Sequence, residues 1–342
     1  MIYKLLLSPF SFLFYIASFI YHKFYNSSLS HPYKPKVKSI CVGNLSVGGT
    51  GKTPMVIWLV DHLLSSNNLL LLSRGYGRKT KGFIEVNEKM SYSHVGDEPL
   101  IYKKLWGSRI NVAVSEKRKH AIEKMLNLFP KINCVLLDDA FQHRSLKAGL
   151  SILLTTYSNP FFSDLPMPSG SLREPVSGAF RSDIIVVTKC PQNITDKEKQ
   201  EITFSLSKYN KPVFFSSIRY SNLINIYDNK SDLIKNVLLV TGIANPEPLL
   251  VHLKSNYNVT HLKFSDHYCF TNRDIKEIHQ KFDNFASNNK VILTTEKDLI
   301  RLIKYESSSL MKKFPWYKIA ISLKFNNEKS LLKLIDNYVR KN

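Results

Sequence analysis

A glycine-rich run between an expected strand and an expected helix is the feature that most constrains how this chain folds. Residues 37–64 read VKSICVGNLSVGGTGKTPMVIWLVDHLL. The run starts as a short β-type segment, turns at 46–53, and continues with Met55, Leu59 and Leu63 at helical spacing. The pattern predicts a strand, a loop and a helix in direct succession, as in α/β units that bind phosphate.

The loop has the composition of a phosphate-binding loop. Glycines let backbone N–H groups close around phosphate oxygens, and the helix N-terminus that follows favours an anion. Lys52 is expected to reach the β- and γ-phosphates, and Thr53 to ligate Mg²⁺. The match to GxxxxGK[ST] is imperfect, because Ser46 stands at the first glycine position and Val47 replaces the second lysine of partition-type ATPases. The residues expected to hold the nucleotide are Gly48, Gly49, Thr50, Gly51, Lys52 and Thr53.

Two further segments bear on the nucleotide and its metal. Residues 133–139 form an apolar run that ends in Asp138 and Asp139, and such a paired acidic group suits a Mg²⁺-nucleotide site. A pair of turn or N-cap aspartates is the plainer alternative. Residues 184–191, IIVVTKCP, are similar to the guanine-reading NKxD motif but lack its Asn and its Asp. ATP is therefore the expected nucleotide.

Apolar runs alternate with helical patterns through the first half of the chain. The runs lie at 38–43, 68–72, 109–114, 133–137, 151–154 and 184–188. This alternation predicts an α/β fold with a P-loop NTPase-like, mostly parallel sheet flanked by helices. The sequence then becomes polar and lysine-rich, and strand patterns restart near residues 237 and 290. We expect a hydrophobic N-terminal segment at 1–30, a P-loop core at 31–224, and a smaller α/β domain at 225–342 that includes the C-terminal helix.

The chain has a large positive charge. Its 342 residues include 48 Lys and Arg against 27 Asp and Glu, which gives a formal net charge of +21. A field of this sign attracts nucleic acid, anionic lipid or a phosphorylated substrate. No RNP, helix-turn-helix or zinc pattern accompanies the charge, so nucleic acid is not an expected partner. The four cysteines lie far apart without a CxxC pair, which argues against a disulfide framework or a zinc ribbon.

The N-terminal segment is long enough to reach a membrane. Residues 5–22 read LLLSPFSFLFYIASFIYH without Lys, Arg, Asp or Glu. As a helix they would extend about 27 Å, close to the hydrocarbon thickness of about 30 Å. Pro9, the serines and the many aromatic residues favour a helix that lies in one leaflet. Membrane association is our expectation, and a buried core helix and a cleaved signal peptide are the alternatives.

Several separated motifs converge on one known family. They are SVGGTGKTP at 46–54, SRGYGR at 73–78, VGDEP at 95–99, LDDAFQHR at 137–144, SLREP at 171–175, TGIANP at 241–246, FSDHYCF at 264–270 and TTEKD at 294–298. In this order the set resembles tetraacyldisaccharide 4′-kinase of lipid A biosynthesis. The resemblance implies that ATP phosphorylates the 4′-hydroxyl of a tetraacyl glucosamine disaccharide 1-phosphate, which forms lipid IVA. It also implies that the reaction takes place at the cytoplasmic face of the bacterial inner membrane.

The resemblance implies roles for individual residues. Asp97 matches the family's proposed general base, and His267 matches the histidine that pairs with it. Without the resemblance, Asp97 is also compatible with an N-cap and His267 with an ordinary turn histidine. The acidic groups implied around Mg²⁺ are Asp138, Asp139 and Glu174. Candidate contacts for phosphate or sugar, by their charge and hydrogen-bonding geometry, are Arg74, Arg118, His143 and Arg173.

The chain departs from the commoner family pattern in two places. Residues 168–171 read PSGS where the family often has an alanine-glycine-proline run, and Tyr268 follows His267 where it often has a second histidine. The second departure puts any role for another histidine in doubt.

The expected site spans two domains, because Asp97 lies in the first and His267 in the second. Catalysis is therefore expected to need the two domains to close, and the chain is expected to act as a monomer. The alternative from another class is a membrane-associated P-loop ATPase, a nucleotide switch that acts on a protein partner. A switch needs no lipid hydroxyl, so ADP release that depends on the lipid acceptor separates the two functions.

Overall fold

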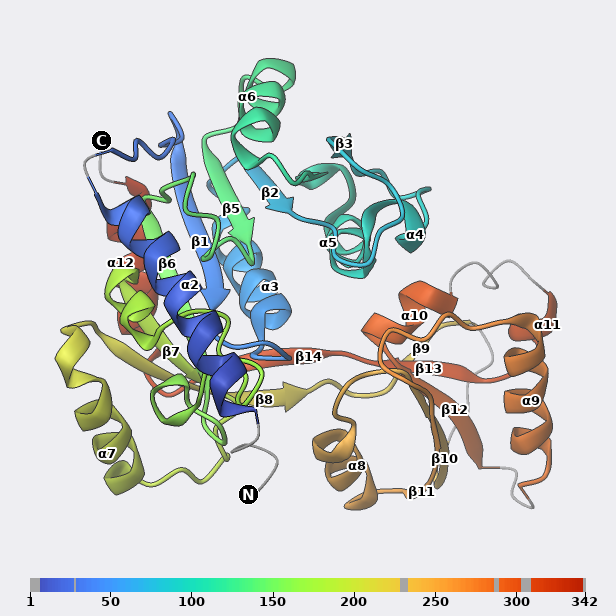
Figure 1. Ribbon diagram of the computed structural model, residues 1–342. Helices are drawn as coiled ribbons and strands as arrows, with labels where there is room; N and C mark the ends of the chain where they lie inside the picture. Colours follow the sequence, from blue (N-terminus) through green and yellow to red (C-terminus); the bar gives the residue numbers. More distant parts are fainter. Residues whose placement is uncertain (1–6, 28, 228–232, 286–288, 303–308, 341–342) are drawn as a thin grey trace.

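Two separate sheets organise the chain, one in each lobe of the molecule (Figure 1). The structure, a computed structural model, describes residues 7–27, 29–227, 233–285, 289–302 and 309–340. Parts of the expected N-terminal segment (1–6 and 28) and of the expected connection between the domains (228–232) lie outside the described residues.

The larger sheet is mostly parallel, as predicted. Only its two edge strands, β14 and β3, pair antiparallel with their neighbours. The order across the sheet is β14 (Ile321–Phe325), β8 (Val213–Tyr220), β7 (Ile184–Thr188), β6 (Leu150–Thr156), β1 (Lys38–Asn44), β5 (Cys134–Asp138), β2 (Leu69–Ser73), β4 (Asn111–Val114) and β3 (Ile84–Glu85). Each of the six predicted apolar runs forms a strand, because strands covered on both faces need apolar residues along their whole length.

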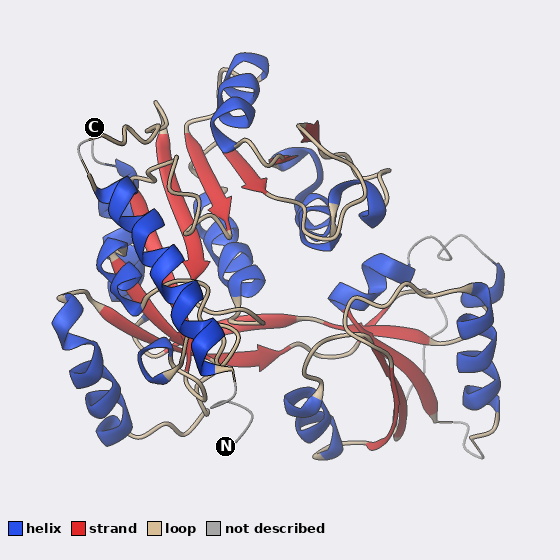
Figure 2. Cartoon of the chain, viewed as in Figure 1, coloured by secondary structure: helices blue, strands red, loops and turns tan. Residues whose placement is uncertain are grey.

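Helices cover both faces of the large sheet (Figure 2). α3 (Lys52–Leu63), α5 (Asp97–Trp106) and α12 (Glu328–Arg340) pack on the face to which β1 turns Ile40 and Val42. α6 (Arg118–Leu128) and the end of α7 (Asp196–Leu206) pack on the other face. The remaining short helices of this lobe are α4 (Tyr92–Val95), η1 (Gly107–Arg109), η2 (Phe161–Ser163), η3 (Val176–Arg181) and η4 (Ser207–Tyr209).

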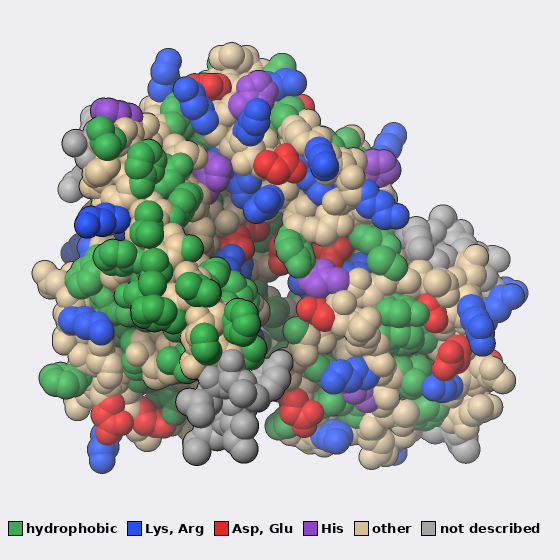
Figure 3. Space-filling model, viewed as in Figure 1, with side chains coloured by type: hydrophobic (Ala, Val, Ile, Leu, Met, Phe, Trp, Pro, Cys, Tyr) green, Lys and Arg blue, Asp and Glu red, His purple; other side chains and the backbone are tan. Residues whose placement is uncertain are grey.

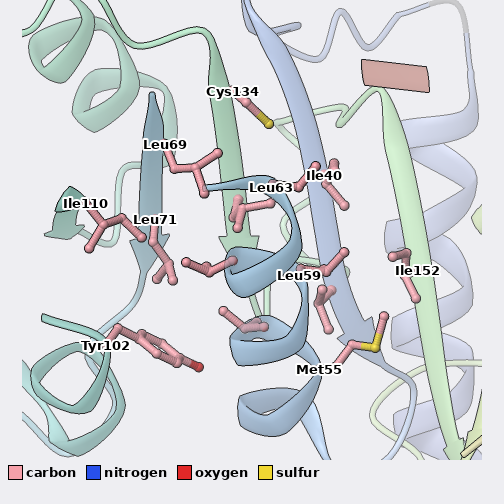
Figure 4. Close-up of a cluster of buried hydrophobic side chains, with 14 of the residues drawn as sticks. Ile40, Met55, Leu59, Leu63, Leu69, Leu71, Tyr102, Ile110, Cys134 and Ile152 are labelled. Carbon is pink, nitrogen blue, oxygen red and sulfur yellow. The ribbon is translucent and has the colours of Figure 1, made fainter. Parts of the chain in front are cut away.

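The helix after the glycine-rich loop is fixed by its apolar side. Met55, Leu59 and Leu63 of α3 lie toward β1 and the neighbouring strands (Figure 4). All three side chains are buried, which confirms the predicted helical spacing. Packing of this stripe holds the N-terminus of α3 at the carboxyl end of β1.

The smaller sheet has its own core. Its order is β11 (Asn258–Lys263), β10 (Asn236–Thr241), β12 (Lys290–Thr295), β13 (Trp316–Ile319) and β9 (Ile224–Asn225), with only β9 antiparallel. α8 (Glu247–Lys254) covers one face. α9 (Asn272–Asp283), the end of α10 (Glu296–Leu302) and α11 (Ser309–Lys312) cover the other.

The predicted domain boundary 225–342 is wrong at its C-terminal end. After β13 the chain returns to the large lobe, where β14 pairs with β8. α12 then buries Leu331 and Ile335 in the core of the large sheet, and Tyr338 Oη accepts the backbone N–H of Ser39 at 3.0 Å. The amphipathic pattern of 330–339 predicted a helix but could not indicate which sheet it covers, because periodicity reports only that one face is buried.

The N-terminal hydrophobic segment forms one helix, α2 (Ser8–Asn26). Ser11 is its one buried residue and exchanges hydrogen bonds with Ser169, whose Oγ lies 2.8 Å from Ser11 Oγ. Arg144 donates to Asn26 Oδ1 at 2.6 Å near the other end. Within the described residues, no helix combines the length and hydropathy needed to cross a bilayer.

The C-terminal helix offers a test of its placement in the large lobe. We expect Leu331→Ala to lower the free energy of unfolding of that lobe by about 2–5 kcal/mol, because the side chain is fully buried. Leu334→Ala on the exposed side of the same helix is the matched control and should change it by less than about 0.5 kcal/mol. Urea denaturation followed by fluorescence measures both values, and equal losses would contradict the placement.

Candidate active site

The glycine-rich loop connects β1 to α3 at the carboxyl end of the sheet, as predicted. Gly51 has φ of +87°, a left-handed conformation that a side chain would strain, and α3 begins at the next residue. Thr188, at the end of β7, donates from Oγ1 to the carbonyl oxygen of Thr50 at 2.8 Å. Gly48 and Gly49 are exposed, so the loop is open to a ligand. Charged side chains gather near this region, where the surface is hollowed between the lobes (Figure 3).

Lys52 and Arg173 meet at one carboxylate beneath the loop. Lys52 Nζ lies 3.6 Å from Asp139 Oδ2 and 3.3 Å from Asn44 Oδ1. Arg173 donates to both oxygens of Asp139, at 2.9 and 3.2 Å, and also to the Asn44 side chain. The predicted phosphate contacts Lys52 and Arg173 are therefore neighbours, although the sequence separates them by more than a hundred residues.

The two aspartates at the end of β5 have opposite electrostatic surroundings. Burial and the nearby carboxylates of Glu98 and Asp139 raise the pKa of Asp138 to about 7. Burial also acts on Asp139, but the hydrogen bonds from Arg173 and the charge of Lys52 outweigh it and lower the pKa of that carboxyl. Asp138 thus lacks a strong cationic partner, whereas Asp139 has two, Arg173 and Lys52.

Asp97 and His267 are brought together from different lobes. Asp97 is the first residue of α5 and is buried, and His267 follows β11 in the small lobe. His267 Nδ1 lies 3.0 Å from Asp97 Oδ2. Arg301 of α10 donates from Nε and Nη2 to the same oxygen, at 2.9 and 2.6 Å. The predicted pairing of Asp97 with His267 is present in the structure, with an arginine added to it.

Glu98 connects this pair to the glycine-rich loop. Its Oε1 accepts a hydrogen bond from Thr53 Oγ1 at 3.3 Å and lies 3.7 Å from Lys297 Nζ. Lys297 Nζ also lies 3.5 Å from His267 Nε2. Two successive residues of α5 therefore bridge the loop of the large lobe and α10 of the small lobe.

Sequence reasoning missed four of these residues. They are Asn44, Glu98, Lys297 and Arg301. Lys297 belongs to the TTEKD motif, and Arg301 lies one helical turn after the aspartate of that motif. The motif therefore indicated that this segment belongs to the site, but it did not indicate which side chains face Asp97.

Glu174 has donors of its own. Gln142 donates to Oε1 at 2.6 Å, and Arg181 donates to Oε2 at 2.6 Å. His22 Nε2 of α2 lies 3.0 Å from Oε2, and burial together with Arg181 lowers the pKa of His22 to about 4, so this histidine is neutral at pH 7. These contacts place Glu174 between α2 and the site, with both oxygens already hydrogen-bonded.

Three of the predicted substrate contacts form a basic cluster. Arg74 follows β2, Arg118 begins α6 after β4, and His143 follows β5, so all three lie at the carboxyl edge of the sheet. Burial and Arg74 lower the pKa of the buried Arg118 to about 10. Burial and both arginines lower the pKa of His143 to about 4. Arg118 Nε is buried without a hydrogen-bond partner among the described residues, so a ligand oxygen would satisfy it.

Asp138 and Asp139 suit a Mg²⁺ ion that binds together with the phosphates of a nucleotide. In the described part of the chain, no group of three or more His, Cys, Asp or Glu side chains is arranged to hold a metal ion. Mg²⁺ ordinarily takes one or two carboxylates together with phosphate oxygens and water. The hydroxyl of Thr53 and the carboxylates of Asp138 and Asp139 are the oxygen groups that would hold such an ion. Burial, together with the charges of Glu98 and Asp139, raises the pKa of Asp138, and a bound cation would stabilise its carboxylate.

The contacts of Glu174 generate a test of its role. We expect Glu174→Gln to lower the free energy of unfolding by about 1–3 kcal/mol, because the partly buried Arg181 then loses its buried anionic partner. Glu123→Gln, in an exposed pair with Lys119, should change it by less than about 1 kcal/mol. Urea denaturation gives both values, and Mg²⁺ titration of the same proteins gives metal affinity. Unchanged stability with weakened Mg²⁺ affinity would instead make Glu174 a metal ligand.

Comparisons with known proteins show the family to which the chain belongs. Residues 3–340 match the protein family LpxK, described as Tetraacyldisaccharide-1-P 4'-kinase. A tetraacyldisaccharide 4'-kinase of Flavobacterium psychrophilum is 41% identical over 97% of this chain and 96% of the relative, and one of Bacteroides thetaiotaomicron is 40% identical over 90% and 85%. The crystal structure of LpxK from Aquifex aeolicus in complex with ATP is 28% identical, with a TM-score of 0.75 over 99% of this chain and 100% of that chain. The chain therefore belongs to the tetraacyldisaccharide-1-phosphate 4′-kinase family of ATP-dependent kinases in lipid A biosynthesis.

Proposed function

We propose that the chain transfers the γ-phosphoryl group of ATP to the 4′-hydroxyl of a tetraacyl glucosamine disaccharide 1-phosphate, with Asp97 as general base. The observation that supports this assignment is the meeting of Asp97 and His267 across the two lobes, linked to the glycine-rich loop through Glu98 and Thr53. A nucleotide switch needs no such pair. A kinase needs a proton acceptor beside the phosphate site.

In the proposed reaction, residues 48–53 hold the phosphates of ATP. Backbone N–H groups of the loop and the N-terminus of α3 bind the phosphate oxygens. Lys52, whose ammonium lies 3.6 Å from Asp139, would turn toward the β- and γ-phosphates. Thr53, Asp138 and Asp139 would hold Mg²⁺, which neutralises negative charge on the phosphates when bound.

Asp97 is ionised and able to accept a proton at neutral pH. Burial raises its pKa, but hydrogen bonds from His267 and Arg301 outweigh burial and bring the pKa below the ordinary value. The 4′-hydroxyl oxygen attacks the γ-phosphorus, its proton passes to Asp97, and the bond to the β,γ-bridging oxygen breaks to release ADP. His267 donates from Nδ1 to Asp97 and so orients the carboxylate.

The basic cluster at the carboxyl edge is the proposed contact for the anionic sugar. Arg118, Arg74 and His143 lie beside the aspartates, and Arg118 has a buried, unpartnered Nε among the described residues. Guanidinium groups suit phosphate oxygens. The net charge of +21 favours approach of the same substrate and of an anionic membrane surface.

The proposed membrane contact is the outer face of α2. This face projects from the large lobe as a broad hydrophobic patch (Figure 3). Its exposed residues include Phe10, Phe12, Leu13, Ile16, Phe19, Ile20 and Phe24. The opposite edge is held by Ser169, Glu174 and Arg144. A helix that is fixed on one edge and apolar on the other suits insertion into one leaflet. The proposed membrane is the bacterial inner membrane, contacted at its cytoplasmic face. The chain is proposed to act there as a monomer.

A phosphoryl-transfer assay tests the proposed reaction. Labelled γ-phosphate from ATP should appear in a tetraacyl glucosamine disaccharide 1-phosphate held in detergent micelles. Asp97→Asn should lower the rate by about 10²–10⁴-fold, because the proton acceptor is lost. Lys52→Ala should lower it by at least about 10²-fold, because a cation on the transferring phosphoryl group is lost. Lys197→Ala, an exposed lysine of α7, is the control. Hydrolysis of ATP without labelled lipid would favour the nucleotide switch.

Vesicle binding tests the outer face of α2. Each buried apolar side chain contributes about 1.5–3 kcal/mol, so Phe12→Ser combined with Ile20→Ser should weaken binding to anionic phospholipid vesicles by at least about a hundredfold. Phe204→Ser removes a phenylalanine of α7 that is more exposed than Phe12 and should leave binding unchanged. Sedimentation with vesicles measures the bound fraction, and equal binding of all three proteins would exclude α2 as the membrane contact.

A further inference from the structure

A buried arginine fixes one oxygen of Asp97. Arg301 is fully buried, and its Nε and Nη2 both donate to Asp97 Oδ2. His267 Nδ1 contacts the same oxygen. Within the described residues, Oδ1 of Asp97 accepts no hydrogen bond, so every polar contact of the carboxylate falls on one oxygen.

The arginine is itself anchored independently of Asp97. Its Nη1 donates to the carbonyl oxygen of Gly242 at 2.9 Å and to Asp298 Oδ1 at 3.1 Å. The Gly242 carbonyl also accepts the backbone N–H of His267 at 3.0 Å. One carbonyl oxygen of the small lobe therefore positions both groups that hold Asp97, and a guanidinium fork is the side chain that reaches all three acceptors at once.

We propose that Arg301 is a positioning residue for phosphoryl transfer, which holds Asp97 Oδ2 so that Oδ1 alone is left to accept the proton of the attacking hydroxyl. This inference deepens the proposed function and rests on the role of Asp97 as general base. Arg301 acts through Asp97 and has no contact with the glycine-rich loop among the described residues.

The surroundings of Asp97 indicate how loss of the fork would change its titration. The titratable and charged groups around it are Arg301, Lys297 and Asp298 from α10, His267 and Asp266 from the loop after β11, Tyr76, whose ring lies against His267, and Glu98 on its own helix. A lysine at position 301 keeps the positive charge but loses two of the hydrogen bonds that favour the carboxylate. The pKa of Asp97 should then rise, and protonation should remove the base at a higher pH.

The test is the pH dependence of phosphoryl transfer to the micellar lipid by Arg301→Lys. We expect kcat near neutral pH to fall about 10–100-fold, because a misplaced carboxylate accepts the proton poorly. The acidic limb of the kcat profile should move to higher pH, and KM for ATP should stay within about twofold because the loop is untouched. An arginine with only a structural role would lower stability and leave the acidic limb in place.

Two further variants keep the outcome decisive. Lys318→Gln breaks another ion pair of α10, with Glu296, and should keep wild-type kcat and pH profile. Asp298→Asn weakens the anchor of Nη1 and should move kcat and the acidic limb in the same directions as Arg301→Lys, but less. If Arg301→Lys does not fold, Asp298→Asn is the variant that tests the proposal. An acidic limb of its kcat profile at the wild-type pH would overturn the proposal.

The same assay separates this inference from the proposed function. Wild type that never labels the lipid, or Asp97→Asn that keeps the rate, would overturn the proposed function and this inference together. Normal transfer by wild type and loss in Asp97→Asn, combined with wild-type kcat and acidic limb in Arg301→Lys, would overturn only the role of Arg301.

Discussion

The burial of Asp97 at the junction of the two lobes is the constraint on which the site depends. A carboxylate taken out of water needs charged or hydrogen-bonding partners, and here the partners on its Oδ2, His267 and Arg301, belong to the small lobe. The electrostatic requirement of one side chain therefore favours docking of α10 against α5. Because Glu98 follows Asp97 and contacts Thr53, the same docking also aligns the small lobe with the glycine-rich loop.

The topology makes this meeting possible. Residues of the site follow the carboxyl ends of parallel strands in both sheets, namely β1 and β5 in the large lobe and β10, β11 and β12 in the small one. Parallel strands place such loops at one edge, where ligands of open α/β sheets bind. Two sheets with facing edges can then surround a nucleotide and its acceptor, each contributing groups of different chemistry.

The N-terminal helix is connected to the same region by buried polar contacts. His22 of α2 contacts Glu174, and Gln142 donates both to Glu174 and to the carbonyl oxygen of Asn44. Asn44 in turn accepts from Lys52 and Arg173 through its side chain. The helix is thus held along one edge by polar side chains of the large lobe, while its other side exposes apolar residues.

Local sequence patterns indicated the six apolar strands of the large sheet, β10 and β12 of the small one, the glycine-rich loop, α3 and the amphipathic C-terminal helix, because backbone conformation and periodic burial depend on neighbouring residues. Resemblance to a family supplied Asp97 and His267 as a pair. Only the tertiary structure assigned α12 to the large lobe, surrounded Glu174 with its own donors and placed Arg301 on Asp97. Apart from the contact of Arg181 with Glu174, 7 positions apart, these contacts join residues 32 to 299 positions apart. Their partners are selected by packing and by the electrostatic cost of burying charge, which no local pattern records.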